Sequence, residues 1–173
     1  MRRRAYIGLG ANQGDLESTV RVAIDSLKPI EQSRFVAASP FYRSAPVDAV
    51  GPDYLNAVVA LDTELEPYGL LLHLLEIEVM LGRKRHGPDA KKNAPRNVDL
   101  DLLMVGSLII RSTPLTLPHP RMHERAFVLR PLLDLAPEVA VPGQGRAADL
   151  LRRITDQRIE IYQAPWPTEP SAG

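Results

Sequence analysis

RNVDLDLLM, residues 96–104, is the stretch of this chain that decides its fold. Side chains alternate across a strand, so Asp99 and Asp101 are expected on one face, and the other face takes the apolar set Val98, Leu100, Leu102 and Met104. Like charges this close disfavour each other, and carboxylate oxygens are ligands that Mg²⁺ and Mn²⁺ prefer. The pair therefore predicts a metal site. The alternative is an edge strand with a solvated acidic face.

A basic segment lies directly before this strand. Asp89 is its only acid, and its basic side chains are Arg83, Lys84, Arg85, Lys91, Lys92 and Arg96. Such runs are usually solvated loops. Beside a carboxylate pair, however, guanidinium groups supply the other half of a polyphosphate site, in which acids hold Mg²⁺ and arginines hold phosphate oxygens. Because the segment has few apolar anchors, we expect it to be mobile and to close over bound phosphates.

The composition bounds the class of protein. A chain of 173 residues is long enough for one domain with a real core and too short for two comfortable ones. Lys plus Arg equals Asp plus Glu at 21 each, so no overall field favours nucleic acid or a membrane surface. The absence of cysteine excludes disulfides and thiolate chemistry. No stretch has the pattern of a signal peptide or a membrane span, so a cytoplasmic location is expected.

The chain opens with a short strand and an amphipathic helix. The strand over residues 5–9 ends in GLGANQGD, which matches neither a dinucleotide fingerprint nor a Walker A loop. We therefore expect a tight turn there, with Asp15 as the N-cap of a helix over residues 16–27. Pro29 ends that helix.

Two β-prone runs follow. Residues 35–42 are interrupted by Pro40, which suits an edge or bent strand. Residues 54–61 alternate as a strand and place Tyr54 and Asn56 on one face. An aromatic ring and an amide at one end of a strand suit a flat heterocycle with polar edges.

A second helix is expected over residues 70–81, with Pro67 in its first turn and Gly82 just after its end. Glu76 and Glu78 are expected at its surface. Its predicted buried side consists of Leu71, Leu74, Leu75, Val79 and Leu81.

The remaining pattern completes the fold. Residues 108–110 are expected to return beside the acidic strand as a hairpin, and residues 126–135 and 147–154 to form helices. The order β-α-β-β-α-β predicts an α+β, ferredoxin-like sandwich with an added hairpin and C-terminal helices. We expect a single domain over residues 1–162 and a disordered tail over residues 163–173, which are rich in Pro and small residues.

The chain resembles the 6-hydroxymethyl-7,8-dihydropterin pyrophosphokinases of folate biosynthesis, in order over roughly residues 5–140. The segments that carry the resemblance are AYIGLGANQGD, SPFYRSAP, PDYLNAVVAL, LGRKR, NAPRNVDLDLL and LPHPRMHERAFVLRPLLDLAP. The resemblance implies transfer of the β,γ-pyrophosphoryl group of ATP to the hydroxymethyl group of the pterin, with release of AMP. Ala11 and Asn97 depart from the commoner pattern, and neither is an expected ligand.

The resemblance also implies roles for residues at the phosphate end. Two Mg²⁺ ions that bridge the triphosphate are expected on Asp99 and Asp101. The implied catalytic residues are Arg83, Arg96, Asp99 and Asp101. The implied ATP ligands are Arg83, Arg85, Arg96, His119 and Arg125.

At the pterin end, the resemblance implies an aromatic sandwich. Tyr54 and Phe127 are expected to stack on the two faces of the ring, and Asn56 to hydrogen-bond its edge. Ser44 and Val47 are expected to line the same pocket. The implied partners are therefore ATP and the hydroxymethyl pterin, without nucleic acid or membrane.

Two other functions fit parts of the pattern. A two-metal phosphodiesterase would use the same carboxylates to activate water, but it predicts a further acidic ligand. A non-catalytic ferredoxin-like module that binds nucleotides or nucleic acid would need exposed aromatic side chains, and only 5% of the residues are aromatic. The sequence shows no exposed apolar stripe that would require dimerisation, so we expect a monomer.

Overall fold

The computed structural model describes residues 1–47, 49–82 and 98–162. Residue 48, the basic segment 83–97 and the tail 163–173 lie outside the described residues. The predictions of a mobile basic loop and of a disordered tail fall on these segments and stay predictions.

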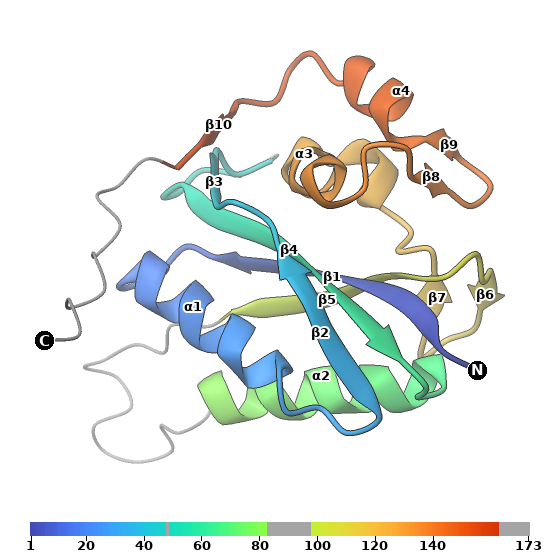
Figure 1. Ribbon diagram of the computed structural model, residues 1–173. Coiled ribbons are helices and arrows are strands. Elements are labelled where there is room, and N and C mark those ends of the chain that lie inside the picture. The colour runs from blue at the N-terminus through green and yellow to red at the C-terminus, as the bar shows by residue number, and fades with distance from the viewer. Residues whose placement is uncertain (48, 83–97, 163–173) are drawn as a thin grey trace, which may run out of the picture.

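The main sheet is antiparallel and, in the described part of the chain, six-stranded (Figure 1). Its order is β10 (Ile159–Ile161), β3 (Tyr42–Ser44), β4 (Tyr54–Thr63), β1 (Arg3–Ala11) and β5 (Asp99–Val105). A further strand, β2 (Ser33–Ala38), pairs with the same β4. The predicted bent run around Pro40 is therefore two short strands, β2 and β3, that follow one another along β4.

Helices cover both faces of the sheet. Helices α1 (Leu16–Leu27) and α2 (Pro67–Gly82) lie on one face, and α3 (Ala126–Leu135) lies on the other, where α4 (Ala147–Arg152) packs against it (Figure 1). A 3₁₀ turn, η1 (Met122–Glu124), precedes α3. Two small hairpins complete the chain: β6 (Ile110–Arg111) with β7 (Thr116–Leu117), and β8 (Ala140–Val141) with β9 (Gly145–Arg146). None of the described helices is long and apolar enough to cross a membrane.

Each face of the sheet has its own apolar core. On β4, Leu55, Val59 and Leu61 pack into the core beneath α1 and α2, whereas Val58 and Ala60 pack into the core beneath α3. The predicted alternation of β4 is confirmed, because side chains of a strand point to opposite faces in turn. Both sets are apolar since helices cover both faces.

The predicted buried side of α2 is partly wrong. Leu70, Leu74 and Ile77 are buried, but Leu75 and Val79 are each 45% exposed. The apolar residues of α2 are distributed around almost its whole circumference, so they do not identify a single buried face. The exposed apolar side chains of α2 are Tyr68, Leu72, Leu75, Val79 and Met80. The chain therefore does carry an exposed apolar stripe, contrary to prediction.

The acidic strand β5 also departs from simple alternation. The register of pairing between β1 and β5 shifts between Tyr6 and Ile7. As a result, the side chain of Met104 packs in the core beneath α3, together with that of Leu103. Met104 was predicted on the face of Leu102, which packs in the other core. A bulge of this kind adds one residue to one strand and reverses the faces beyond it. The predicted hairpin partner is likewise wrong, because β6 pairs with β7 and not with β5.

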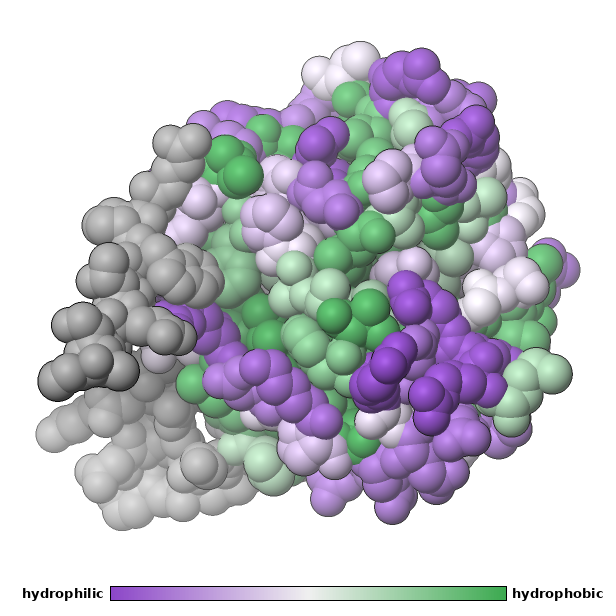
Figure 2. Space-filling model, viewed as in Figure 1, coloured by the Kyte–Doolittle hydropathy of each residue, from purple (hydrophilic) through white to green (hydrophobic). Residues whose placement is uncertain are grey.

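Asp62 joins three strands of the sheet. Its carboxylate accepts from Nε of Arg4 on β1 at 2.6 Å and lies 3.2 Å from Nη2 of Arg34 on β2. Figure 2 shows strongly hydrophilic side chains gathered near the N-terminus, in keeping with these exposed ion pairs. Arg4 foremost, and Arg34, hold the pKa of Asp62 below its ordinary value.

We expect Asp62→Asn to destabilise the protein at pH 7, because it removes the charge that pairs with Arg4 and Arg34. The expected loss is only about 1 kcal/mol, because both arginines are exposed to solvent. The folded-state pKa is lowered, so the carboxylate stabilises the fold above its unfolded pKa, and this contribution is lost as the pH falls through the folded value. Urea unfolding of both proteins at pH 7 and near pH 3 measures the effect. An equal difference at both pH values would contradict the prediction.

Candidate functional site

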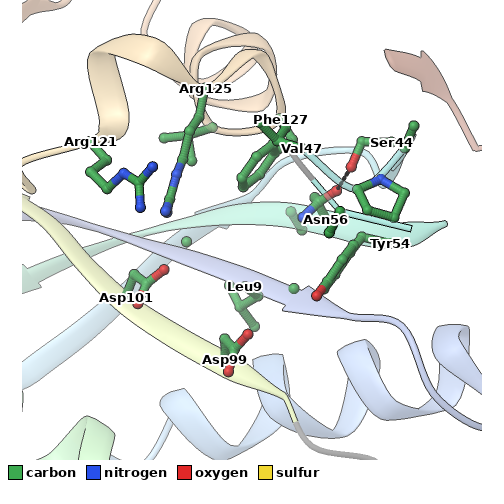
Figure 3. A pocket seen from close by; sticks show the side chains of 17 residues that line it. Leu9, Ser44, Val47, Tyr54, Asn56, Asp99, Asp101, Arg121, Arg125 and Phe127 are labelled. Carbon is green, nitrogen blue, oxygen red and sulfur yellow. Dashed lines mark hydrogen bonds between the residues drawn. The ribbon is translucent and has the colours of Figure 1, made fainter. Parts of the chain in front are cut away.

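A cavity of about 360 Å³ opens between the sheet and the N-terminus of α3 (Figure 3). It lies where the apolar core under α3 ends, beyond Val58 and Ala60 on β4. Eight predicted site residues line it, namely Ser44, Val47, Tyr54, Asn56, Asp99, Asp101, Arg125 and Phe127. The fold therefore brings the expected phosphate end and the expected pterin end into one cavity.

Strand register explains why the two ends meet. On the central strand β1, Gly10 pairs with Asn56 of β4 on one side and with Asp99 of β5 on the other. Gly8 lies in the same way between Val58 and Asp101. Neighbouring strands are about 4.8 Å apart, so Asn56 and Asp99 are separated by about 10 Å across the sheet. That distance suits a small bicyclic molecule that reaches a phosphate group.

The glycines form the floor of the cavity. Gly8 was predicted in the strand and Gly10 in the turn after it, but β1 continues through both to Ala11. A Cβ on Gly10 would lie 3.0 Å from Nδ2 of Asn56, closer than a side chain tolerates without displacing its neighbour. The turn comes later and ends at Asp15, which caps α1 as predicted by accepting from the amide of Ser18 at 3.2 Å.

Asp99 and Asp101 point from β5 into the cavity, on the same face as predicted (Figure 3). Burial, followed by the charge of Asp101, raises the pKa of Asp99, and Arg125 opposes this change. In the described part of the chain, no cluster of three or more His, Cys, Asp or Glu side chains is placed to hold a metal. The pair fits a hydrated divalent cation that takes its other ligands from phosphate and water, which is how proteins usually bind Mg²⁺.

Glu78 was predicted at the surface of α2, but its side chain is partly buried against β5. Its Oε2 accepts the backbone amide of Leu100 at 2.7 Å, between the two aspartates. Burial first, and then Asp99 and Asp101, raise the pKa of Glu78. Among the described strands β5 is the last of the sheet, so its outer amides have no strand partner there, and a carboxylate from α2 satisfies this one. Glu78 thus fixes the backbone that carries both aspartates.

Two arginines face the aspartates from the other side of the cavity. Arg125 was predicted, and Arg121 was missed (Figure 3). No ion pair of either is present within the described residues. The guanidinium of Arg125 lies 5.5 Å from the centroid of the Phe127 ring. Guanidinium groups across from carboxylates leave a space suited to a phosphate chain with a bound cation.

His119 lies beside this space, although it does not line the cavity. Its backbone amide donates to the carbonyl of Leu103 at 2.8 Å, and its Nδ1 accepts the amide of Arg121 at 3.2 Å. Burial lowers the pKa of His119, whereas Asp101 acts to raise it. A neutral imidazole that accepts at Nδ1 carries its proton on Nε2, so His119 presents a hydrogen-bond donor.

At the far end of the cavity, two aromatic side chains lie near a pair of buried polar side chains. Phe127 on α3 and Tyr54 on β4 project into it from different elements (Figure 3). Asn56 and Ser44 are both 3% exposed, and the Ser44 hydroxyl donates to Oδ1 of Asn56 at 2.6 Å. This bond orients the amide so that Nδ2 remains to donate to a ligand.

Three predicted site residues lie outside the described residues. They are Arg83, Arg85 and Arg96 of the basic segment. Their roles toward ATP stay predictions.

Comparisons with known proteins agree on one family. The chain matches the family model "7,8-dihydro-6-hydroxymethylpterin-pyrophosphokinase (HPPK)" over residues 6–137. It is 38% identical over 161 residues to the 2-amino-4-hydroxy-6-hydroxymethyldihydropteridine pyrophosphokinase of Pseudomonas aeruginosa, covering 92% of this chain and 97% of that protein. It is 42% identical over 158 residues to the protein of the same name from Methylorubrum extorquens, covering 91% and 97%.

Solved structures with the same fold include an HPPK-DHPS of Plasmodium falciparum with pterin and p-hydroxybenzoate. The TM-score is 0.67 at 13% identity, over 88% of this chain and 43% of that one, so the present chain spans less than half of the longer protein. The likeness to this structure concerns the fold alone. With a family match over most of its length and relatives of nearly equal extent, the chain belongs to the 7,8-dihydro-6-hydroxymethylpterin-pyrophosphokinase (HPPK) family.

Proposed function

We propose that this protein transfers the pyrophosphoryl group of ATP to 6-hydroxymethyl-7,8-dihydropterin, giving the pterin diphosphate and AMP, as a step of folate biosynthesis. The observation that carries the proposal is the single row Asn56–Gly10–Asp99 across three strands, which sets a heterocycle slot about 10 Å from a carboxylate pair. Family membership supplies the reaction class.

The pterin is proposed to lie between Tyr54 and Phe127, with its polar edge toward Asn56. Stacking on both faces favours a flat bicycle, and the oriented amide discriminates against heterocycles that lack a matching acceptor. This placement directs the hydroxymethyl group along the row toward Asp99.

ATP is proposed to place its phosphate chain between the two aspartates and the arginines Arg121 and Arg125. Asp99 and Asp101 would hold two Mg²⁺ ions, which neutralise phosphate charge and fix the chain for in-line displacement. Arg125 and His119 would bind phosphate oxygens with charged and neutral donors, respectively. The loop arginines Arg83, Arg85 and Arg96 are proposed to complete this half of the site.

The reaction exchanges one phosphorus–oxygen bond for another and releases one proton. The hydroxymethyl oxygen of the pterin attacks the β-phosphorus of ATP, and the bond from that phosphorus to the oxygen bridging α and β breaks. AMP leaves with that oxygen, and the hydroxyl proton is released. The residues of the cavity contribute mainly by position and electrostatics, because phosphoryl transfer asks little covalent chemistry of the protein.

Further features of the protein belong to the same proposal. We class the sheet with the ferredoxin-like folds, on the order β1-α1-β2/β3-β4-α2-β5 and the spatial order in which β1 and β4 are central. Residues 1–162 are proposed to form the single catalytic domain of a cytoplasmic protein.

The test is incubation with ATP, Mg²⁺ and 6-hydroxymethyl-7,8-dihydropterin, followed by chromatography of nucleotides and pterins. The proposal requires AMP to appear in step with pterin diphosphate, and chelation of the metal to stop both. Formation of ADP would contradict it. AMP and pyrophosphate formed without pterin would instead identify a phosphodiesterase.

Gly10→Ala is expected to raise the KM for the pterin by roughly tenfold, because small displacements at a binding site are costly. The added Cβ would lie 3.0 Å from Nδ2 of Asn56, which is buried and held by Ser44. Gly69→Ala is the matched control, since a Cβ on Gly69 meets no atom within 4 Å. Steady-state kinetics of both variants provide the measurement, and equal pterin KM values would count against the proposed contact.

A further inference from the structure

The C-terminal segment of residues 157–161 touches both walls of the substrate cavity. One wall is formed by β3 and the loop that leads to Tyr54, and the other by the N-terminus of α3. Strand β10 pairs with β3 (Figure 1), and the carbonyl of Arg158 accepts the amide of Ala45 at 3.4 Å. The segment is 31 positions beyond Ala126 in the chain, yet it lies against the start of α3.

Gln157 makes the contact with α3. Its Oε1 accepts the backbone amide of Ala126 at 2.9 Å, and its Nε2 donates to the carbonyl of Glu124 at 2.8 Å. The N-cap residue of α3 is Arg125, whose side chain makes no capping hydrogen bond. The first amides of a helix need acceptors from outside it, and a cap usually comes from the N-cap side chain itself. Here Gln157 supplies one of these acceptors from a distant part of the chain.

The capped backbone carries two side chains of the cavity. Arg125 and Phe127 flank Ala126, and both line the space proposed for ATP and the pterin. A guanidinium has hydrogen-bond donors and no acceptor, so an N-cap arginine that is proposed to bind phosphate cannot also cap the helix. Gln157 resolves this conflict, because it bonds the backbone on both sides of Arg125 and leaves the guanidinium free.

A second cavity of about 260 Å³ adjoins the first and is lined in part by the segment. Gln157 and Arg158 line it together with Arg121 and Arg125. The two cavities share Arg121 and Arg125, so Gln157 and Arg158 lie beside these arginines without lining the first cavity.

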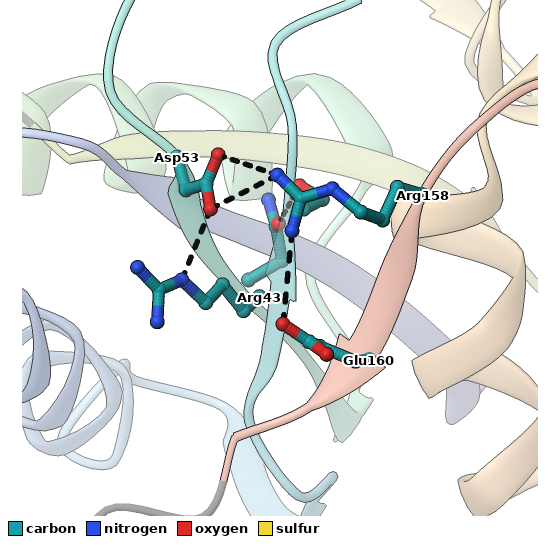
Figure 4. Close-up of polar contacts among 6 residues, drawn as sticks. Arg43, Asp53, Arg158 and Glu160 are labelled. Atoms are coloured by element: carbon teal, nitrogen blue, oxygen red, sulfur yellow. Dashed lines mark hydrogen bonds and ion pairs between the residues drawn. The ribbon is translucent and has the colours of Figure 1, made fainter.

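Arg158 makes the contact with the other wall. Its Nη2 lies 3.0 and 3.2 Å from the two carboxylate oxygens of Asp53, the residue before Tyr54, and Arg43 donates to the same carboxylate at 3.0 Å (Figure 4). The side chain of Arg158 is 56% exposed, and exposed ion pairs contribute little. The hydrogen bonds of Gln157 are therefore the stronger candidate for holding the cavity in shape.

We propose that Gln157 is a positioning residue of the substrate site, which caps α3 from the C-terminal segment and thereby fixes Arg125 and Phe127 toward ATP and the pterin. The inference rests on the proposed function for the identity of the substrates. It assigns a role to a residue that contacts neither of them.

The test compares Gln157→Met, which keeps the length of the side chain and removes both hydrogen bonds, with Gln157→Glu, which keeps an acceptor for Ala126. Gln144→Met, at an exposed turn between β8 and β9, is the matched control. Amide hydrogen exchange by NMR reports the cap directly. In Gln157→Met, the Ala126 amide is expected to exchange at least roughly tenfold faster than in the wild type, and the amides of α1 are expected to keep their rates.

Steady-state kinetics separate positioning from stability. Gln157→Met is expected to raise the KM values for both the pterin and ATP by roughly tenfold and to change kcat by less than about threefold. Gln157→Glu is expected to fall between the wild type and Gln157→Met. Gln144→Met is expected to match the wild type in all of these measurements.

The outcomes distinguish the two proposals. If the wild type forms no AMP with the pterin, the proposed function fails, and the exchange rate of Ala126 still reports whether Gln157 caps α3. If the wild type is active and Gln157→Met loses protection at Ala126 but keeps both KM values within twofold, the positioning role is overturned. Unchanged protection at Ala126 would overturn it as well.

Discussion

Replacing Asp101 by Asn is expected to lower the turnover number for AMP formation by roughly 1,000-fold, and Asp99→Asn is expected to do the same. Each substitution keeps the shape of the side chain and removes one of the two charges proposed to hold Mg²⁺. The loss should appear in kcat, because the metal-bound phosphates gain most in the transition state. Quantifying AMP and pterin diphosphate under saturating substrates measures it.

Stability gives an independent check on this assignment. Asp99 is partly desolvated beside Asp101, and both effects raise its pKa. Removing either charge relieves repulsion, so in metal-free buffer the thermal midpoint is expected to stay within about 2 °C of the wild type or to rise. Asp25→Asn, at an exposed position on α1, is the control and should leave activity unchanged. Near-normal turnover in both active-site variants would remove the metal assignment.

The sequence predicts the elements well where a pattern has one interpretation. The alternation over β4 and the capped helix after Asp15 are both found as expected. The helix over residues 126–135 has the bounds that were predicted for it. In each case local chemistry and burial favour the same structure.

The predictions of structure are wrong where the same sequence pattern fits two different structures. Helix α2 is apolar on nearly all sides, so its sequence does not identify the side that packs, and Leu75 was placed wrongly. The bulge that reverses Met104 has no local signal, because Leu103 and Met104 are both apolar and fit either face. Gly8 and Gly10 resemble turn residues, yet both lie within β1 and line the cavity, where a Cβ on Gly10 would lie 3.0 Å from Nδ2 of Asn56.

In the candidate site, too, some residues could be predicted from the sequence and others could not. Asp99, Asp101, Tyr54 and Asn56 could be proposed from the sequence because their residue types and spacing carry the chemistry. Glu78 and Gln157 act through contacts between distant elements, Glu78 from α2 to β5 and Gln157 from the C-terminus to α3. No spacing in the sequence encodes such contacts, so only the fold reveals them.

Asn56→Ala is expected to weaken pterin binding by roughly 100-fold, because it removes a buried donor and leaves a second buried group unpaired. Asn56 is almost fully buried, and its Oδ1 accepts from Ser44 at 2.6 Å. Ser44→Ala is expected to cost roughly tenfold, since the amide remains but loses its orientation. Binding of the pterin in the presence of Mg²⁺ and a non-hydrolysable ATP analogue, followed by pterin fluorescence, measures both losses.

The other end of β4 provides a matched control for this prediction. Thr63 is fully buried and shares a 2.7 Å hydrogen bond with Ser33 on β2, as Asn56 does with Ser44 on β3. Thr63→Ala should therefore lower stability by about 1–3 kcal/mol while the affinity for the pterin stays within about twofold of the wild type. Affinity for the ATP analogue alone should be equal in all four proteins, because the row across the sheet separates Asn56 from Asp99 by two strand spacings. If Asn56→Ala and Thr63→Ala weaken pterin binding equally, the loss reflects general destabilisation, and Asn56 does not contact the ring.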